Sequence, residues 1–419
     1  MFLYKYSTLM LAITVSVMTP VYASTDVAML SNTVSPYVVG GDDVDSNTPA
    51  SENFMASLRN NKVAEKPFCG ATVINDQWVL TAAHCVVTGS GESTVVIAPS
   101  DITITVGLID NSRPLENHIF SATHVVVYPD YSPEAIIKTT TESNNQVTTE
   151  VITTEVITTE VITTVLDNDV ALIRVNRKFS RVGQVNLPTQ EQAIDIEKKL
   201  NQQWNNSDFQ GSTIHDKNLK VLGWGVTDPS GSSDSASDTL QQAMLSLFPI
   251  DLCYNRLESN EHPGLIIDNP ANITKLCALP SEISGYIDNT PYGIDACFGD
   301  SGGPILAQDD NGKWFQIGIV SGGIIGELKC GSMTLPSFYA RVGTYTNWIA
   351  DNISKVPSNP ITPPDFLADK YDDTDSEDCN DSLSANNCNI GKDRDSGGSF
   401  SFIGLLLLCS GVFFRRLRI

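Results

Sequence analysis

The ten residues DACFGDSGGP, at positions 295–304, are the most informative stretch of this chain. Ser301 stands between Asp300 and two glycines. Glycine lets a backbone turn tightly and lets a second chain come close, which suits a serine that is presented to another molecule. A serine hydroxyl is a weak nucleophile by itself and needs a neighbouring base. A chemical role for Ser301 therefore requires a base, and a group that orients the base, elsewhere in the sequence.

Two other stretches supply these groups. His84, in VLTAAHC at 79–85, carries an imidazole that can take up a proton near neutral pH. Asp169, in DNDVALI at 167–173, begins an apolar run in which its carboxylate could be held dry and could stabilise a charged imidazole. Each motif alone is weak, because Ser-Gly-Gly is usually a turn, a His beside a Cys is often a packed residue, and an Asp can cap a strand. Their combination in the order His, Asp, Ser indicates nucleophilic catalysis.

Composition and patterning narrow the class of protein. The chain has 419 residues, nine cysteines and a net charge of -23. This number of cysteines is typical of an oxidising compartment, and the negative charge argues against nucleic-acid binding, which needs basic patches. Between residues 38 and 354, short Val- and Ile-rich runs alternate with Gly, Pro, Asn and Asp, which favours an all-β barrel or sandwich. Apolar residues at helical spacing predict one helix in TYTNWIADNIS, 344–354.

Two insertions interrupt the strand pattern. The sequence TTEVI occurs three times between residues 148 and 162. An odd period of five places successive valines on opposite faces of a strand, so we expect a mobile loop or an irregular hairpin there. This insertion could restrict access to a substrate groove or could have no role. The segment 190–217 is polar, rich in Gln and Asn, and expected to be exposed.

Both ends of the chain are expected to be processing segments. Residues 1–23 contain an apolar run that ends in Val-Tyr-Ala, which predicts a secretory signal peptide, and 24–37 would then be a short propeptide. Residues 355–396 are rich first in proline and then in acids, which predicts a stiff and then a disordered linker. Residues 397–419 contain an uncharged apolar run, barely long enough to span a bilayer, followed by arginines.

Five motifs together resemble those of the trypsin/chymotrypsin family of serine endopeptidases, over about residues 38–354. They are VVGG (38–41), LTAAHC (80–85), DNDVALI (167–173), GWG (223–225) and GDSGGP (299–304). The resemblance implies an all-β fold of two six-stranded antiparallel β-barrels, with the active site between them and a C-terminal helix. It makes His84 the general base, Asp169 its orienting carboxylate and Ser301 the nucleophile. The backbone N–H groups of Gly299 and Ser301 would form the oxyanion hole, and no metal or cofactor is implied.

The resemblance also assigns a primary specificity pocket. Asp295 corresponds to its floor and implies trypsin-like cleavage after Arg or Lys, because a buried carboxylate needs a cationic partner. Three further positions would bind substrate: Ser321, Gly323 and Ser337. The family usually has Trp where Gly322 stands, so packing against the preceding substrate side chain should weaken. A glycine is usual at position 337, so its hydroxymethyl group could narrow the pocket or shift the preference between Arg and Lys.

Activation and disulfides follow from the same resemblance. The precursor would be cleaved before Val38, and the new α-amino group would pair with Asp300, which would otherwise be a buried charge without a partner. Tyr37 precedes this bond where a trypsin-activated relative has Arg or Lys, so a separate activating protease is expected. The implied disulfides are Cys69–Cys85, Cys253–Cys277 and Cys297–Cys330. Outside the family region, Cys379 and Cys388 could close a small loop, and Cys409 is expected to be free.

The C-terminal segment resembles the Gly-Gly sorting signal of Gram-negative bacteria. It has Gly397 and Gly398, one short hydrophobic stretch, and arginines between 415 and 418. This implies export through the periplasm by type II secretion, tail removal by a rhomboid-type protease, and a secreted or cell-surface location. The precursor would carry a C-terminal membrane segment, and an ordinary membrane anchor is the alternative.

The leading hypothesis is an exported, monomeric, trypsin-like serine endopeptidase that cleaves protein or peptide substrates through an acyl-enzyme. One alternative is a catalytically silent relative that serves as a binding protein. The presence of all three candidate catalytic residues argues against it. A second alternative is a protease of elastase-like or chymotrypsin-like preference, against which Asp295 argues.

Overall fold

The computed structural model describes residues 39, 41–48, 53–61, 66–144, 154–206, 215–258 and 264–372. Several expectations fall on residues outside these ranges: the signal peptide 1–23, the propeptide 24–37, Val38, the Cys379–Cys388 loop, and the sorting tail 397–419.

The first barrel consists of six strands in a closed antiparallel order. Around the barrel these are β11 (Ala171–Val175), β4 (Trp78–Thr81), β3 (Cys69–Val73), β2 (Met55–Asn60), β7 (Ile102–Val106) and β8 (Ile119–Val127). The barrel closes because β11 pairs with β4 on one side and β8 on the other, so that Leu172 lies opposite both Leu80 and Val126. Val- and Ile-rich runs suit these strands, because β-branched side chains pack well on a pleated surface.

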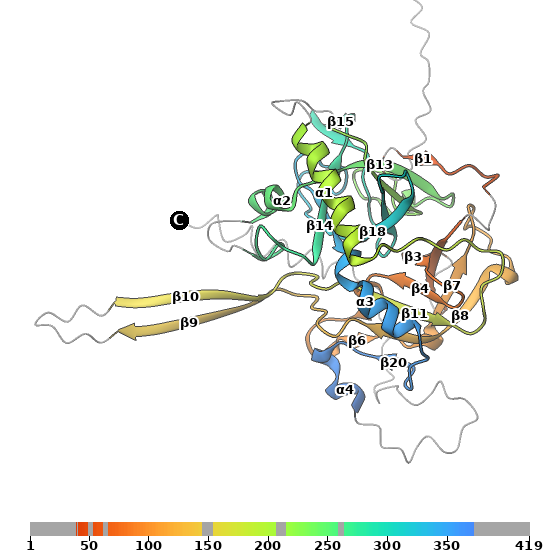
Figure 1. Cartoon of the computed structure of the whole chain (residues 1–419), viewed down its shortest axis with the longest axis horizontal. Coiled ribbons are helices and arrows are strands. Elements are labelled where there is room, and N and C mark those ends of the chain that lie inside the picture. The colour runs from red at the N-terminus through yellow and green to blue at the C-terminus, as the bar shows by residue number, and fades with distance from the viewer. Residues whose placement is uncertain are drawn as a thin grey trace, which may run out of the picture. The chain divides into compact units, whose positions relative to one another are not determined.

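The second barrel has the same construction. Its strands are β13 (Gln241–Phe248), β12 (Leu219–Gly223), β17 (Pro304–Gln308), β18 (Trp314–Gly323), β19 (Ser337–Arg341) and β14 (Lys275–Pro280). Pairing of β13 with β14 closes it, and β1 (Asp42–Asp43) adds to β13. The helix α3 (Val342–Ile353) follows β19 directly. The predicted double-barrel, all-β fold with a C-terminal helix is therefore confirmed (Figure 1).

Hydrogen bonds join the two barrels in the region where the motifs meet. Thr72 on β3 donates its hydroxyl to the side-chain oxygen of Gln316 on β18, with an O–O distance of 2.7 Å. The Gly70 N–H donates to the carbonyl oxygen of Ser301 at 2.7 Å. These bonds place the segment that carries Ser301 against the first barrel.

Shorter elements connect the barrel strands. They are α2 (Ile250–Leu257), β5 (Val87–Thr88), β6 (Val95–Val96), β15 (Ile283–Ile287) and β16 (Thr290–Gly293). Single turns of 3-10 helix occur at Ala83–Cys85, Gly91–Ser93, Pro99–Asp101, Glu116–His118, Ser233–Ser235 and Asp365–Leu367.

The described residues on either side of 145–153 form the two paired strands of a hairpin in the TTEVI insertion. Its strands β9 (Ile136–Asn144) and β10 (Thr154–Thr163) pair antiparallel, and Figure 1 shows them as one long two-stranded ribbon. The register shifts between Val161 and Thr163, so the hairpin is irregular near its base. Of the two conformations that the repeat allowed, the structure has the irregular hairpin.

The segment 190–217 differs from its expected exposure. It contains the helix α1 (Gln190–Asn206), which buries Ala193, Ile196, Leu200 and Trp204. These four residues recur every three or four positions and therefore share one face of a helix. The Gln- and Asn-rich composition reflects the other, exposed face.

The segment predicted as a linker also differs in its first part. Residues of β20 (Ile361–Thr362) pair in parallel with β8, and α4 (Asp369–Asp372) follows. Ile361 and Leu367 are buried in the core of the first barrel. The backbone N–H of Val96 donates to the Tyr371 hydroxyl at 2.8 Å. The expected linker, stiff and then disordered, is therefore wrong for residues 361–372, because two apolar side chains and a strand pairing attach this segment to the barrel.

Candidate active site

His84 and Asp169 lie in direct contact. His84 belongs to the helical turn Ala83–Cys85, which follows β4, and Asp169 lies just before β11. The backbone N–H of His84 donates to Asp169 Oδ1 at 2.8 Å, and His84 Nδ1 lies 2.7 Å from Asp169 Oδ2. The Asp169 side chain is 0% exposed, whereas that of His84 is 23% exposed. The carboxylate therefore holds both the backbone and the ring of His84, and leaves Nε2 for a partner.

Ser321 adds a third hydrogen bond to this carboxylate. Its hydroxyl donates to Asp169 Oδ2 at 2.6 Å. The resemblance placed Ser321 among the substrate-binding residues, and its bond to Asp169 was not foreseen from the sequence. The buried Asp169 carboxylate thus accepts bonds from two side chains and one backbone group, which is what a buried negative charge requires.

The pKa of the His84 imidazole reflects two opposed effects. Burial lowers this pKa, whereas the charge of Asp169 and the hydrogen bond to it raise it, and the net result is a raised pKa. A raised pKa strengthens the imidazole as a proton acceptor, provided that the pH keeps it neutral before reaction.

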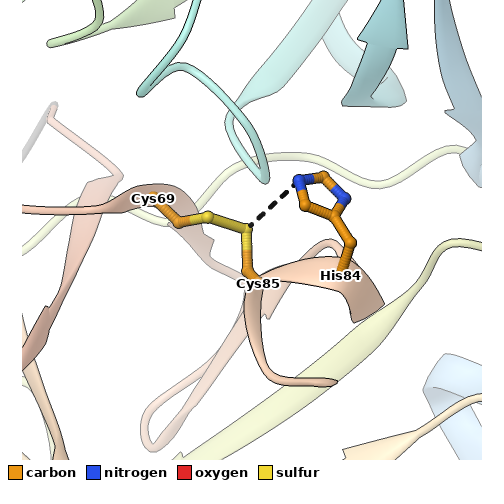
Figure 2. Close-up of side chains that lie close together, drawn as sticks. All are labelled: Cys69, His84 and Cys85. Atoms are coloured by element: carbon orange, nitrogen blue, oxygen red, sulfur yellow. Dashed lines mark hydrogen bonds between the residues drawn. A yellow bond between two sulfur atoms is a disulfide. The ribbon is translucent and has the colours of Figure 1, made fainter. Parts of the chain in front are cut away.

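Figure 2 shows the disulfide between Cys69 and Cys85 beside the His84 ring. The Cys85 sulfur lies 3.8 Å from His84 Nε2. The ligand-type atoms of the two cysteines and the histidine come within 4.8 Å of one another. Because the sulfur atoms are bonded to each other, they are not thiolates, the form in which cysteine binds metals. Two further disulfides join Cys253 to Cys277 and Cys297 to Cys330, so all three are the pairs that the resemblance implies.

The segment that carries Ser301 lies against the same disulfide. A Cβ atom placed on Gly302 would lie 3.2 Å from the Cys85 sulfur, which itself contacts His84. Within the described residues, no hydrogen bond joins Ser301 to His84. Catalytic hydrogen bonds are often long in ligand-free enzymes and tighten on substrate binding.

Gly299 occupies a backbone conformation that favours glycine. Its φ is 97°, and a Cβ atom there would lie 3.0 Å from Gly225 Cα. Across the part of the chain that the structure describes, the N–H groups of Gly299 and Ser301 have no hydrogen-bond acceptor. Two free amides next to a serine hydroxyl can bind a developing oxyanion.

Asp300 is buried beside the GWG motif. Its carboxylate accepts the backbone N–H of Gly225 at 2.8 Å and that of Cys297 at 2.9 Å. Burial raises the pKa of Asp300 to about 6, although both hydrogen bonds lower it. Val39 is fully buried in a small cluster that includes Val226 and the Cys297–Cys330 disulfide. Val39 therefore packs in the same region as Asp300, while Val38 lies outside the described residues.

Asp295 and Ser337 contact each other. The Ser337 hydroxyl donates to Asp295 Oδ2 at 2.9 Å, and the Ala296 N–H donates to Oδ1 at 2.8 Å. Burial raises the pKa of Asp295 to about 7, while these bonds and one from the Gly331 backbone lower it and nearby Asp300 raises it. Ser337 therefore partly satisfies the buried carboxylate of Asp295. A Cβ on Gly323 would lie 3.5 Å from the Ser337 hydroxyl oxygen.

The space beside Gly322 is already filled. A Cβ atom on Gly322 would lie 2.7 Å from Phe338 Cζ and 3.3 Å from Leu166 Cδ1. The usual indole at this position would collide with both side chains. The sequence showed that the indole is missing, but not that Phe338 and Leu166 take up its place.

A comparison with family models and curated proteins agrees with this geometry. The family model described as Trypsin matches residues 38–111 and 112–349. The chain is 28% identical over 294 residues to CLIP domain-containing serine protease B4 of Anopheles gambiae, which covers 68% of this chain and 62% of that protein. It is 28% identical to phenoloxidase-activating factor 3 of Holotrichia diomphalia, over 75% of this chain and 72% of that one. It is 26% identical to human serine protease 41, over 71% of each chain.

These relatives overturn the predicted localisation. The C-terminal segment suggested export from a Gram-negative bacterium with a membrane segment in the precursor, whereas these relatives come from insects and a mammal. Among the residues with a described structure, no helix is both long and apolar enough to cross a membrane. The Gram-negative localisation is therefore wrong. A short apolar run with glycines before it and arginines after it is a weak signal, since many unrelated chains can have that composition.

The matched family model covers most of the chain, and the fold is the double barrel that the motifs imply. This chain belongs to the trypsin family and is a serine-type endopeptidase.

Proposed function

We propose that this protein hydrolyses peptide bonds after Arg or Lys, with His84, Asp169 and Ser301 as its catalytic residues. The observation that carries the proposal is the buried hydrogen-bonded array of Asp169, His84 and Ser321 beside the segment of Ser301. It supports a base that is oriented by a carboxylate and lies next to a serine, which is what acyl transfer requires.

The reaction would proceed in two halves. His84 Nε2 takes the proton of the Ser301 hydroxyl while Oγ attacks the carbonyl carbon of the scissile bond. The N–H groups of Gly299 and Ser301 donate to the resulting oxyanion, and one such donor is worth about 3–4 kcal/mol to the transition state. His84 then gives its proton to the departing amine, which leaves an ester at Ser301. Water, deprotonated by His84, releases the acid and restores the hydroxyl.

Specificity for a cationic side chain would come from Asp295. A buried carboxylate without a cation is costly, and an Arg or Lys side chain can supply both charge and donors. The hydroxyl of Ser337 would narrow the pocket at Asp295. Ser321 and Gly323 belong to β18, the strand along which the substrate would lie.

Activation would depend on the new amino group at Val38. The buried Asp300 and the buried Val39 support an arrangement in which a cleaved N-terminus enters this part of the second barrel. An ammonium there would pair with Asp300 and hold the loop of Gly299. Tyr37 before the bond implies that another protease, one that accepts an aromatic residue, acts as activator. We further propose that residues 1–23 direct secretion, that 24–37 form the propeptide, and that the domain 38–354 acts as a monomer.

The test is a hydrolysis assay on protein cut before Val38. Peptide nitroanilides that differ only in the scissile residue, Arg, Lys, Phe or Ala, are compared for wild type, Ser301→Ala and Ser230→Ala, the last a matched exposed serine. Hydrolysis of the Arg and Lys substrates by wild type and Ser230→Ala, and none by Ser301→Ala, is expected. Covalent labelling by an organophosphorus reagent should likewise require Ser301. Equal turnover in Ser301→Ala would refute the catalytic assignment, and a preference for Phe or Ala would refute the pocket assignment.

A further inference from the structure

Lys275 is a buried cation that the proposed reaction does not use. It is the first residue of β14 and is 1% exposed. Its Nζ donates to Thr164 Oγ1 at 2.6 Å, to the carbonyl oxygen of Val165 at 2.7 Å and to that of Ile266 at 2.6 Å. An ammonium has three donors, so this one is fully used in a single geometry.

Within the part of the chain that the structure describes, acids around Lys275 balance its charge and none forms a direct ion pair with it. Burial lowers the pKa of Lys275 to about 8, while four nearby carboxylates raise it: Asp167, Asp169, Glu258 and Asp268. A buried ammonium is costly unless it is hydrogen-bonded, and each of its acceptors would be left unpaired without it.

The three acceptors belong to two segments that are far apart in the sequence. Thr164 and Val165 directly follow β10 and form the base of the long hairpin. Ile266 lies in the loop that the Cys253–Cys277 disulfide closes. The Val165 N–H also donates to the Leu265 carbonyl oxygen at 2.8 Å. Lys275 therefore ties the hairpin base to this loop.

The loop itself is held in place by Glu258. Its carboxylate accepts the backbone N–H groups of Leu265, Ile266 and Ile267, at 2.8, 2.9 and 2.7 Å. The loop thus offers the Ile266 carbonyl oxygen to Lys275 from a defined position.

Both residues whose side chains fill the space at Gly322 are linked to this ammonium, Leu166 through the backbone of Val165 and Phe338 through its ring. Leu166 follows Val165 directly and has a φ of 51°, which is unusual for a residue other than glycine and requires support from its surroundings. The Phe338 ring centroid lies 5.5 Å from Lys275 Nζ. Lys275 is therefore linked to Gly322 on β18 in two ways. One is through the backbone of Val165 and Leu166, and the other is through the ring of Phe338.

We propose that Lys275 is a positioning residue that holds Leu166 and Phe338 against Gly322, and thereby shapes the groove for the substrate residues that precede the scissile bond. This inference rests on the proposed function. Lys275 does not touch the substrate, so its effect should appear only for substrates long enough to reach the wall that it supports. A substrate with a single residue before the bond should not depend on it.

The test compares two nitroanilides with the same leaving group and the same scissile arginine. One is benzoyl-arginine nitroanilide and the other has three further residues before the arginine. The variants are Lys275→Met, which removes the charge at similar length, and Thr164→Val, which removes one acceptor. Lys220→Met is the matched control. Lys220 lies on β12 of the same barrel, and its ammonium lies 4.5 Å from the centroid of the Trp314 ring.

The ratio of kcat/KM for the long substrate to that for the short one should fall about tenfold in Lys275→Met, because a misplacement of about 1 Å can cost about a hundredfold and we expect a smaller displacement here. Thr164→Val should lower the ratio less, and Lys220→Met should leave it unchanged. An unchanged ratio in Lys275→Met and Thr164→Val, with wild type active on both substrates, would overturn the inference alone. If Lys275→Met does not fold, an unchanged ratio in Thr164→Val overturns it. If wild type cleaves neither substrate, the proposed function fails and the inference falls with it.

Discussion

The hydroxyl of Ser337 should set the pH at which the pocket captures a cation. It donates to Asp295 Oδ2 at 2.9 Å and lowers the pKa of that carboxyl, which burial raises to about 7. Ser337→Ala removes this donor and leaves the backbone donors of Ala296 and Gly331 in place. The pKa of Asp295 should therefore rise further, and a smaller fraction of the enzyme should carry a charged pocket at neutral pH.

The size of this effect follows from the buried geometry. A hydrogen bond to a charged group contributes about 1.5–3 kcal/mol, and one pKa unit corresponds to about 1.4 kcal/mol. The pKa of Asp295 should thus rise by about one to two units. At pH 7 the ionised fraction would fall from about a half to between about a tenth and about a hundredth, so the affinity for a cationic ligand should fall about fivefold to fiftyfold.

Benzamidine is a cation that binds without a chemical step. Its affinity, measured by calorimetry between pH 5 and pH 9, therefore reports the ionisation of Asp295 directly. The ratio of the two affinities should be largest at the acidic end of this range and should shrink toward pH 9, where a growing fraction of Asp295 is ionised in both proteins. Ser281→Ala is the control, since this buried hydroxyl of the same barrel donates to the Met244 carbonyl oxygen instead. A pH profile of Ser337→Ala that coincides with that of wild type would refute the reasoning.

The same carboxyl makes the free enzyme less stable as the pH rises. The pKa of Asp295 in the fold lies above its ordinary value of 3.8, so the folded chain binds this proton more tightly than the unfolded chain. The protonated form stabilises the fold at low pH, and this contribution is lost as the pH rises from about 4 to about 7. A bound amidine offsets the loss, so benzamidine should raise the Tm more at pH 8 than at pH 5.

Three other changes test separate parts of the molecule. Ser321→Ala should lower kcat roughly tenfold or more with little change in KM, because a donor to the Asp169 carboxylate is worth about 1.5–3 kcal/mol; Ser246→Ala is the control, and an unchanged kcat would contradict the role of Ser321. A chain that ends at Ser354 should have a lower Tm than one that ends at Asp372, since Ile361 and Leu367 each contribute about 1.5–3 kcal/mol by burial; equal Tm values in scanning calorimetry would show that β20 does not stabilise the barrel. Tyr37→Arg should make the precursor activatable by added trypsin, as followed by N-terminal sequencing and nitroanilide hydrolysis, and full activity in a form that still carries residues 24–37 would show that release of Val38 is not required.

The sequence by itself determined the family-level features of this protein. The motifs around His84, Asp169 and Ser301 resemble those of the trypsin/chymotrypsin family, and that resemblance implied the two β-barrels that the structure has. The order of these residues in the chain, His84 then Asp169 then Ser301, is enough to identify the family without any long-range contact. The helix α1 was also within reach of the sequence, since Ala193, Ile196, Leu200 and Trp204 follow helical spacing, but the many Gln and Asn residues of its exposed face obscured that pattern.

Only the tertiary structure decided how the departures from the family pattern are accommodated. Gly322 lacks an indole, and its space is taken by Leu166, which follows the hairpin, and by Phe338 on a neighbouring strand. Lys275 finds its three acceptors in segments that lie 9 to 111 residues away. Residues 361–372 looked like a linker by composition, yet pack on the first barrel. Such contacts join segments that only barrel closure brings together. Local periodicity in a sequence shows which residues are neighbours along the chain. The hydrogen-bond partners of a buried charge, and the side chains that pack beside a glycine, come from distant segments and are fixed only by the tertiary structure.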